Sequence, residues 1–312
     1  MPTKKRSISS ESRLSRRGLL LGPVGLLAAR RAPGAEAPRI ERPEEGRLAF
    51  LAGKRTLFEY RYSAARPKTY VHPFCAPDGT PLTQDGPADH VHHRGLMLAW
   101  SEVNGYDFWG EVNPAPHGRI EHVSFEKISA KGPAAFTERV HWVAGGETLL
   151  VERRTIRALV GYHDAVALEW VSELAAAEKP VVIAAGKHVY NGLGIRFVAS
   201  MDGGGVLNSE GTVVIEKANG EPARWCAYHG ALSDGRRAAV AIFDHPSNPR
   251  HPSPFFVMNQ PFGYLSAAPT FRGPFPRLEP GRSIRLRYAV MGLLGELQAD
   301  RIEELYKRWS AG

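Results

Sequence analysis

The sequence predicts an all-β protein: one large antiparallel β-sandwich with a single C-terminal α-helix. Short runs that alternate apolar and polar residues follow one another at fairly even spacing, which is typical of the strands of a sandwich. The chain is rich in Gly (32) and Pro (24), the residues that turns between strands require. Only one segment, near the C-terminus, repeats its apolar residues with a helical period. We therefore expect a single domain over residues 47–312.

Residues 1–37 are predicted to be a twin-arginine export signal, and residues 38–46 a linker. Ser15, Arg16 and Arg17 open the motif SRRGLL, and an apolar stretch over residues 19–29 follows. Basic residues, an apolar stretch and small residues in this order are typical of an export signal. The stretch is too short for a stable membrane span, and no other run is longer. We expect export by the twin-arginine translocase to the periplasm or the exterior, with no membrane span in the mature chain.

The charge of the chain is concentrated in this same segment. Residues 1–37 contain eight basic and two acidic residues, which contribute 8 − 2 = +6 of the formal net charge of +8. The remainder therefore carries 8 − 6 = +2. A nearly neutral domain has no electrostatic reason to bind nucleic acid, so we expect no nucleic-acid partner.

The first strands are expected at residues 47–51 and 55–62, as a hairpin around Gly53. Phe58, Tyr60 and Tyr62 alternate with polar residues, which places the three rings on one face. Residues 70–82 are rich in turn residues, with a tight turn at Asp78. Further strands are expected at residues 120–128, 137–143, 148–159, 166–174, 181–185, 194–199, 212–216, 238–243, 255–258 and 283–291.

The C-terminal helix is expected over residues 296–309, where the apolar residues recur on one face. We expect it to pack on the outside of the sheets. Cys75 and Cys226 are the two cysteines of the chain. At this low density we interpret them as buried small apolar residues, with a disulfide as the alternative in an oxidising compartment.

Residues 89–95, with the sequence DHVHHRG, are the strongest candidate for a functional site. The segment holds a carboxylate, three imidazoles and a guanidinium within seven residues. If it is extended, His90 and His92 point to one face and His93 to the other. Imidazoles act as general acids and bases near neutral pH. Alternatively, Asp89, His90 and His92 bind a divalent metal, which would need further ligands from elsewhere.

Three further segments carry polar and aromatic residues suited to a pocket. The loop NGYDFW follows the histidines at residues 104–109, and DHPSNPRHP closes an apolar strand at residues 244–252. The segment YNGLGIR at residues 190–196 has two glycines that permit close approach of the backbone. The sequence contains no GxSxG, Walker A, HExxH or CxxC motif, which argues against serine hydrolases, NTPases, zincins and thioredoxins.

Several of these stretches together resemble a bacterial family of secreted proteins that is called the methane oxygenase PmoA family. The matching pieces are YVHPFCAPDGTPLT, DHVHHRGLMLAW, VNGYDFW, YNGLGIRF, WCAYHG and IFDHPSNPRHP, with Val91 where the family usually has proline. The resemblance implies a β-supersandwich like that of galactose mutarotases, and a role connected with carbohydrate. A membrane methane monooxygenase subunit would need several spanning helices, which this sequence lacks.

We therefore expect an exported carbohydrate-active enzyme of lyase, hydrolase or epimerase type that acts by acid–base chemistry. The catalytic candidates are His92, His93, Asp244 and His245. The candidates for substrate binding are His90, Arg94, Asn104, Asp107, Trp109, Tyr190, Arg196, Asn248, Arg250 and His251. No cofactor is predicted, although a divalent metal is compatible with the motif. The alternatives are a carbohydrate-binding protein without catalysis and a metal-dependent enzyme. The acid–base enzyme hypothesis requires the loops at residues 89–95, 104–109 and 244–252 to meet in one pocket.

Overall fold

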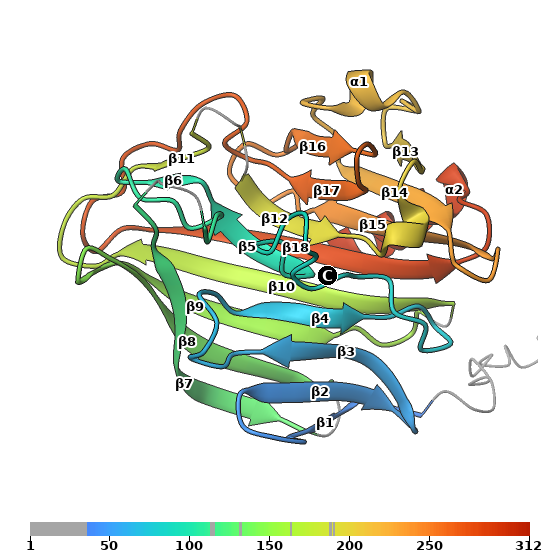
Figure 1. The fold of residues 1–312 in the computed structure, drawn as a ribbon, viewed down its shortest axis with the longest axis horizontal. Coiled ribbons are helices and arrows are strands. Elements are labelled where there is room, and N and C mark those ends of the chain that lie inside the picture. Colours follow the sequence, from blue (N-terminus) through green and yellow to red (C-terminus); the bar gives the residue numbers. More distant parts are fainter. Residues whose placement is uncertain (1–35, 113–115, 131–132, 163, 187–188, 190) are drawn as a thin grey trace, which may run out of the picture. The chain divides into compact units, whose positions relative to one another are not determined.

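The structure, a computed structural model, describes residues 36–112, 116–130, 133–162, 164–186, 189 and 191–312. The described residues all belong to one compact unit. The predicted export signal lies outside the described residues except for its last two positions. Within the described residues, this unit is built mainly from two eight-stranded sheets (Figure 1). The predicted antiparallel β-sandwich is confirmed.

The first sheet has the strand order β1-β2-β3-β4-β5-β12-β17-β16, and neighbouring strands are antiparallel. The hairpin predicted around Gly53 is present. The predicted linker contains a short strand, because its residues pair with β2. The strands are β1 (Arg39–Glu41), β2 (Arg47–Ala52), β3 (Arg55–Arg61), β4 (Tyr70–Phe74), β5 (Leu96–Trp100), β12 (Asn191–Arg196), β16 (Phe255–Met258) and β17 (Tyr264–Ala267).

The second sheet has the order β13-β14-β15-β18-β10-β9-β8-β7 and is also antiparallel. Three of its four longest strands, β18, β10 and β9, are direct neighbours, and β8 separates them from the fourth, β7. This part of the sheet therefore has long runs of paired residues. The strands are β7 (Arg119–Ser129), β8 (Ala135–Ala144), β9 (Glu147–Ala158), β10 (Ala165–Ala176), β13 (Gly205–Asn208), β14 (Trp225–Ala231), β15 (Arg237–Asp244) and β18 (Ser283–Leu294). A separate two-stranded sheet joins β6 (Glu102–Val103) and β11 (Ile183–Ala184).

The hydrophobic core lies between the two large sheets. Phe58 and Tyr60, which alternation places on one face, are both fully buried, and the rings of Tyr60 and Tyr62 stack with centroids 6.2 Å apart. Apolar residues of both sheets form one continuous cluster. Burial of this apolar surface is the main favourable contribution to folding. Cys75 and Cys226 are buried and free, in agreement with their interpretation as small core residues.

A buried ionic cluster also joins the two sheets. Arg154 on β9 forms two hydrogen bonds with Glu152, at 2.8 and 2.7 Å, and neither side chain is exposed. The same guanidinium donates to Thr69 and, at 3.0 Å, to the hydroxyl of Tyr60 on β3 of the first sheet. Tyr60 in turn donates to Glu138. Because buried charges are tolerated only when they are paired and hydrogen-bonded, these partners have to remain in register across the core.

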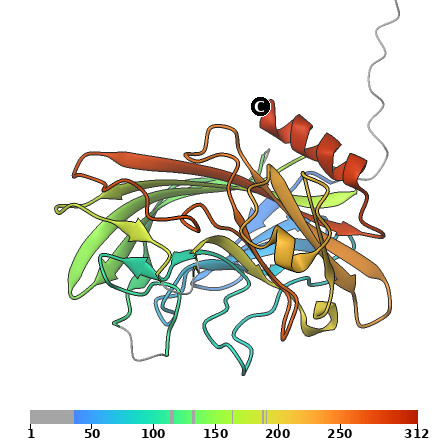
Figure 2. The same ribbon diagram turned by 90° about the horizontal axis from the view of Figure 1, so that it is seen from above.

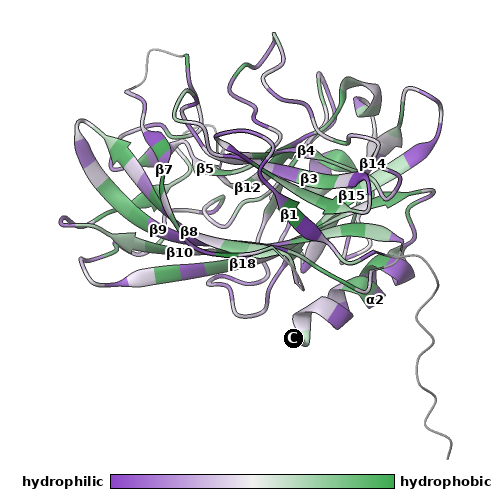
Figure 3. Ribbon diagram, turned by 90° about the horizontal axis from the view of Figure 1, so that it is seen from below, coloured by the Kyte–Doolittle hydropathy of each residue, from purple (hydrophilic) through white to green (hydrophobic). Residues whose placement is uncertain are grey.

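The C-terminal helix α2 (Ala299–Ser310) packs on the outer face of the second sheet, as predicted. Figure 2 shows it outside the layer that contains β18, and Figure 3 shows alternating polar and apolar positions along it. Ile302, Tyr306 and Trp309 are buried against β14, β15 and β18. The described helices include none with both the length and the apolar character needed to cross a bilayer.

Some local predictions were wrong. The strand expected at residues 212–216 is absent, and the helix α1 (Ile215–Ala218) begins inside this segment. Val213 and Val214 are 63% and 42% exposed, so their β-branched side chains have no sheet to pack against. The strand expected at 181–185 is reduced to the two residues of β11. Conversely, β4 forms within the turn-rich residues 70–82, and β13 and β14 form where no strand is predicted.

Candidate functional site

The histidine-rich segment is a pair of turns, so the condition under which His90 and His92 would share one face, an extended backbone, is not met. The backbone N–H of His90 donates to the carbonyl of Pro87 at 3.0 Å, and that of His93 donates to the carbonyl of His90 at 3.0 Å. Gly95 ends the segment with φ +62° and leads into β5. A Cβ at this position would collide with the carbonyl oxygen of Val71. The glycine therefore allows the loop to lie directly against the first sheet.

Because the segment turns, the three imidazoles gather instead of alternating between two faces. The rings of His90 and His93 are stacked, with centroids 4.8 Å apart and planes at 16°. His92 lies edge-on to both, at 5.5 Å from His90 and 4.6 Å from His93. All three line one pocket with a volume of about 220 Å³. The other residues that line it are Ser101, Asp107, Trp109, Gly110, Phe256, Met258, Phe262 and Tyr264.

The loop at residues 104–109 forms the second wall. The carboxylate of Asp107 accepts hydrogen bonds from the backbone N–H groups of Trp109 (2.7 Å) and Gly110 (2.9 Å). These bonds hold the loop in a tight turn. The indole of Trp109 is 2% exposed, and its centroid lies 5.6 Å from that of Tyr264. The predicted binding residues Asp107 and Trp109 therefore lie in the same pocket as the histidines.

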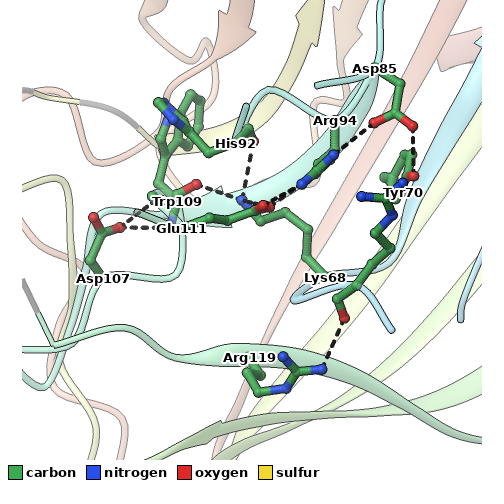
Figure 4. Close-up of polar contacts among 11 residues, drawn as sticks. Lys68, Tyr70, Asp85, His92, Arg94, Asp107, Trp109, Glu111 and Arg119 are labelled. Carbon is green, nitrogen blue, oxygen red and sulfur yellow. Dashed lines mark hydrogen bonds and ion pairs between the residues drawn. The ribbon is translucent and has the colours of Figure 1, made fainter. Parts of the chain in front are cut away.

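A buried lysine connects the two walls (Figure 4). The ammonium of Lys68 donates to the carbonyl of His92 at 3.3 Å and to that of Trp109 at 2.5 Å. It also forms an ion pair with Glu111 at 3.2 Å, and both side chains are at most 5% exposed. One cation therefore binds the backbone of each loop and the carboxylate that follows the second loop.

The same carboxylate binds Arg94, which was predicted to contact substrate. Two hydrogen bonds join the guanidinium to Glu111, at 3.1 and 2.5 Å, and a third, at 3.4 Å, joins it to Asp85 (Figure 4). Asp85 also accepts from the hydroxyl of Tyr70 at 2.9 Å. Arg94 does not line the pocket. Its position behind the histidines makes it a support for the walls.

The strands β12 and β17 supply the base of the site. Arg196, at the end of β12, is 3% exposed and places its guanidinium 3.8 Å from the ring centroid of Phe262. One of its terminal nitrogens is 3.3 Å from Nδ1 of His93, and the other donates to Asp89 at 3.1 Å. Gly194 lies beneath Tyr264, where any Cβ would collide with the phenol. The glycine-containing segment therefore serves close packing, as the sequence suggested.

Burial keeps two of the imidazoles neutral. Burial, followed by neighbouring positive groups, lowers the pKa of His93 to about 2. Burial and then the ammonium of Lys68 lower the pKa of His92 to about 4. Desolvation disfavours a charged ring, so both rings are in the free-base form at pH 7.

Asp89 and His90 form a hydrogen-bonded pair, with Asp89 Oδ2 and His90 Nδ1 3.0 Å apart. Burial alone would raise the pKa of Asp89, but hydrogen bonds with His90 and Arg196 outweigh it and hold the pKa below its ordinary value. The carboxylate is therefore ionised at pH 7 and can only accept. It follows that Nδ1 of His90 carries a hydrogen, and that Nε2 presents a lone pair when the ring is neutral.

The loop at residues 244–252 lies elsewhere, and the predicted convergence of three loops was wrong. None of its residues is among the described residues that line the pocket. The buried carboxylate of Asp244 accepts from Asn248 at 2.7 Å and contacts Nδ1 of His251 at 2.7 Å. His245 packs against Trp309 of α2, with ring centroids 5.1 Å apart. Arg250 donates to backbone carbonyls of Pro269, Gly273 and Pro274.

These contacts explain the polar residues of that loop without a ligand. Asp244 also accepts from the backbone N–H of Ser253 at 2.9 Å, so it organises the turns of its own loop. Sequence alone cannot separate a loop stabilised by its own polar residues from one that presents them to a substrate.

One further candidate, Asn104, does not line the pocket. Asn104 donates to the carbonyl of Pro180 at 3.0 Å and accepts from the N–H of Val182 at 2.8 Å, so it holds two loops together. Tyr190 lies outside the described residues. The alternative metal set of Asp89, His90 and His92 is not assembled. In the described parts of the chain, no three His, Cys, Asp or Glu side chains are placed to hold a metal ion.

Sequence reasoning missed Lys68, Glu111, Phe262 and Tyr264. None of them lies in a motif, and a single lysine or glutamate between apolar runs normally indicates a solvated position. Glu111 lies two residues after Trp109, which in hindsight was the available signal. Tyr264 and Phe262 belong to the segment FFVMNQPFGYL, whose aromatic residues are equally consistent with core packing.

Comparison with known families shows a match to the family of unknown function DUF6807 over residues 47–307. The chain belongs to this family. The methane oxygenase label is not part of that description. A search of curated proteins found no match.

Among solved structures, the chain is similar to two of heparinase III, the BT4657 gene product. One, with methylated lysines, has a TM-score of 0.35 and 11% identity over 86% of this chain and 36% of that chain. The other has a TM-score of 0.33 and 13% identity over 78% of this chain and 34% of that chain. The chain therefore spans about a third of the length of these structures. At these scores the similarity carries no argument about activity.

We predict that replacing Lys68 with methionine destabilises the protein by about 3–5 kcal/mol, because it leaves a buried carboxylate and two carbonyls short of a partner. Urea unfolding followed by fluorescence measures the change. Lys179→Met is the matched control, since Lys179 pairs with Glu147 at 2.7 Å on the surface and such pairs contribute little. Equal losses in the two variants would contradict the structural role of Lys68.

The low pKa of His93 predicts a specific dependence of stability on pH. The unfolded chain binds a proton at this residue below about pH 6.5, whereas the folded protein does not until about pH 2. Its contribution to stability is therefore complete above pH 6.5 and is lost as the pH falls. Between pH 6.5 and 5, where carboxylates are still ionised, the loss reaches about 1.4 kcal/mol per pH unit.

Urea unfolding at pH 7, 6 and 5 tests this dependence. The decrease of the unfolding free energy per pH unit should be smaller in His93→Gln than in the original protein. It should be unchanged in His141→Gln, since His141 is a half-buried residue of β8 that does not line the pocket. An unchanged slope in His93→Gln would show that His93 is not kept neutral by the fold.

Proposed function

We propose that this member of the DUF6807 family is an exported carbohydrate-active enzyme that transfers a proton to and from a sugar through histidine. A lyase or epimerase reaction suits this chemistry best, and hydrolysis is the other possibility that the sequence raised. The observation that carries the proposal is the meeting of three imidazoles with an aromatic wall in one pocket. Titratable groups that converge in a mostly apolar pocket are the usual mark of an active site.

The wall of the pocket suits a sugar ring. Trp109, Tyr264 and Phe262 offer aromatic surfaces on which the C–H face of a pyranose can pack, much as other apolar groups do. Ser101 and Asp107 stand in the same lining and can exchange hydrogen bonds with hydroxyl groups. A few polar groups in a mostly apolar concavity orient a ligand and select it.

His90 is the base in this proposal. Asp89 accepts the Nδ1 hydrogen of His90 and so directs the lone pair of Nε2 outward, as the carboxylate does in Asp–His catalytic pairs. Arg196 holds Asp89 from the other side at 3.1 Å. The base would take a proton from a carbon or a hydroxyl of the sugar and return it to the product or to the leaving group.

In His93 the ring hydrogen is on the other nitrogen than in His90. A guanidinium has donors only, so Nδ1 of His93 accepts from Arg196 at 3.3 Å. The hydrogen of the neutral ring is then on Nε2. A fixed neutral donor beside the base would stabilise negative charge that develops on a sugar oxygen. Arg196 thus sets complementary roles for the stacked rings of His90 and His93.

These assignments revise the roles expected from the sequence. His92 and His93 were the expected proton-transfer groups and His90 a binding group, whereas the hydrogen bonds favour His90 as the base. His92, neutral and in the lining, is proposed to contact the substrate. Asp244 and His245 have no part in the proposed chemistry, because their contacts are with their own loop, Arg287 and α2.

Catalysis is tested with purified protein and a panel of methyl pyranosides and disaccharides in D₂O. NMR records deuterium incorporation, epimerisation, elimination or cleavage. His90→Gln should lower turnover by about 10²–10⁴-fold and change the dissociation constant of the sugar only slightly. His245→Gln, outside the pocket, should keep full turnover. Sugar binding without conversion of any compound would instead identify a carbohydrate-binding protein, and turnover that survives in His90→Gln would exclude His90 as the base.

Export to the periplasm or the exterior rests on the motif SRRGLL at residues 15–20. Replacing Arg16 and Arg17 with lysine should leave the protein in the cytoplasm, since the twin-arginine pair is read by its translocase. Immunoblots of cell fractions provide the measurement, and the same exchange at Arg30 and Arg31 is the control. Continued export of the Arg16/Arg17 variant would mean that another route carries the protein.

A further inference from the structure

The methionines of this chain differ in their exposure to solvent. The sequence contains five, and Met1 lies outside the described residues. Met97, Met201 and Met291 are 0% exposed. Met258, the last residue of β16, is partly exposed and lines the pocket. Within the described ranges, Met258 is therefore the methionine that a dissolved reagent can reach.

The register of the first sheet fixes where this side chain lies. Met258 pairs with Tyr264 across the neighbouring strands β16 and β17 (Figure 1). Phe256 lies two positions before it on the same strand. Paired residues of antiparallel strands share a face of the sheet, as do residues two positions apart. Phe256 and Tyr264 both line the pocket, so the thioether of Met258 belongs to the same apolar wall.

Oxidation would change this wall chemically. A lone pair of the thioether sulfur attacks one oxygen of hydrogen peroxide, and the O–O bond breaks. The hydroxide that leaves takes the proton from the transferred oxygen, which gives a sulfoxide and water. The sulfur loses two electrons and the peroxide gains them. The product is a polar side chain where the thioether was apolar.

We propose that Met258 is an oxidation site through which peroxide modifies the pocket. The three core methionines are shielded, because peroxide cannot reach a side chain that is packed at the density of an organic crystal. The assignment of the site is independent of the proposed function. Its effect on sugar binding rests on that function, since the same pocket is proposed to hold the sugar.

Peptide mass spectrometry tests the selectivity of the reaction. The purified full chain is treated with hydrogen peroxide for increasing times, and the gain of one oxygen atom is measured at each methionine. Met258 should react at least about tenfold faster than Met97, Met201 and Met291, since core packing excludes the reagent. In urea-unfolded protein the four rates should converge, which separates exposure from intrinsic reactivity. Equal rates in the folded protein would overturn the proposal.

The effect on the pocket is measured without any ligand. Proton–carbon NMR spectra record the ring Cε1–H signals of His92 and His93, which line the pocket, and of His245, which does not. Oxidation should shift the two pocket signals, because a sulfoxide adds a polar group to the wall that they face. The signal of His245 should stay in place. Unchanged pocket signals after oxidation of Met258 would mean that the modification does not alter the site.

Met258→Leu and Met291→Leu form a matched pair of variants. Each keeps an apolar side chain of similar volume, the first in the pocket wall and the second in the core. Each variant is compared with itself before and after peroxide. The pocket signals should shift in Met291→Leu as in the original protein and stay in place in Met258→Leu, where the wall has lost its thioether. A shift that persists in Met258→Leu would overturn the assignment to Met258.

Calorimetry with the methyl glycosides of glucose, galactose and mannose measures the consequence for binding. Oxidation should weaken binding of the glycoside that binds by roughly fourfold, the equivalent of one lost methylene contact. An unchanged affinity would overturn this consequence and leave the oxidation site in place. Failure of all three glycosides to bind would count against the proposed function, whereas the mass spectra and the histidine signals would still decide the role of Met258.

Discussion

The ammonium of Lys68 is the contact on which the pocket depends. The lysine side chain is 1% exposed. Its ammonium is shared by Glu111 and by the carbonyls of His92 and Trp109, which come from two different loops. A buried ammonium is stable only while all of these partners stay in place. The two walls are therefore held at one separation before any ligand arrives. Preorganisation of this kind reduces the entropy that binding has to overcome.

The next residue links the pocket to the core. Thr69 accepts from the core guanidinium of Arg154, while Lys68 reaches the outer side of the first sheet. The short segment before β4 therefore joins the ionic cluster between the sheets to the ionic cluster behind the histidines. Displacement of one sheet relative to the other would disturb both clusters, which connects the packing of the sandwich to the shape of the site.

The loops at residues 89–95 and 244–252 look alike in sequence and differ in use. Both combine aspartate, histidine and arginine. In the first, imidazole rings line a pocket while arginine and aspartate stand behind them. In the second, Asp244 is hydrogen-bonded to Asn248, His251 and Ser253, so its polar groups bond to one another within the loop. The composition of a segment shows only that polar groups are concentrated there. The direction of each side chain decides whether these groups line a pocket or bond to their own loop.

The sequence by itself determined the class of fold, most of the long strands, the C-terminal helix and the segment that carries the imidazoles, because alternation, helical period and local composition are short-range properties. It did not determine that the histidines gather in turns, or which loop faces them. Those features depend on partners far away in the chain, such as Arg196, which lies 103 positions from His93. Only the tertiary structure brings such groups together. It also decides which ring nitrogen of His90 and of His93 carries the hydrogen, because the tautomer of an imidazole is set by the group that hydrogen-bonds to its nitrogen.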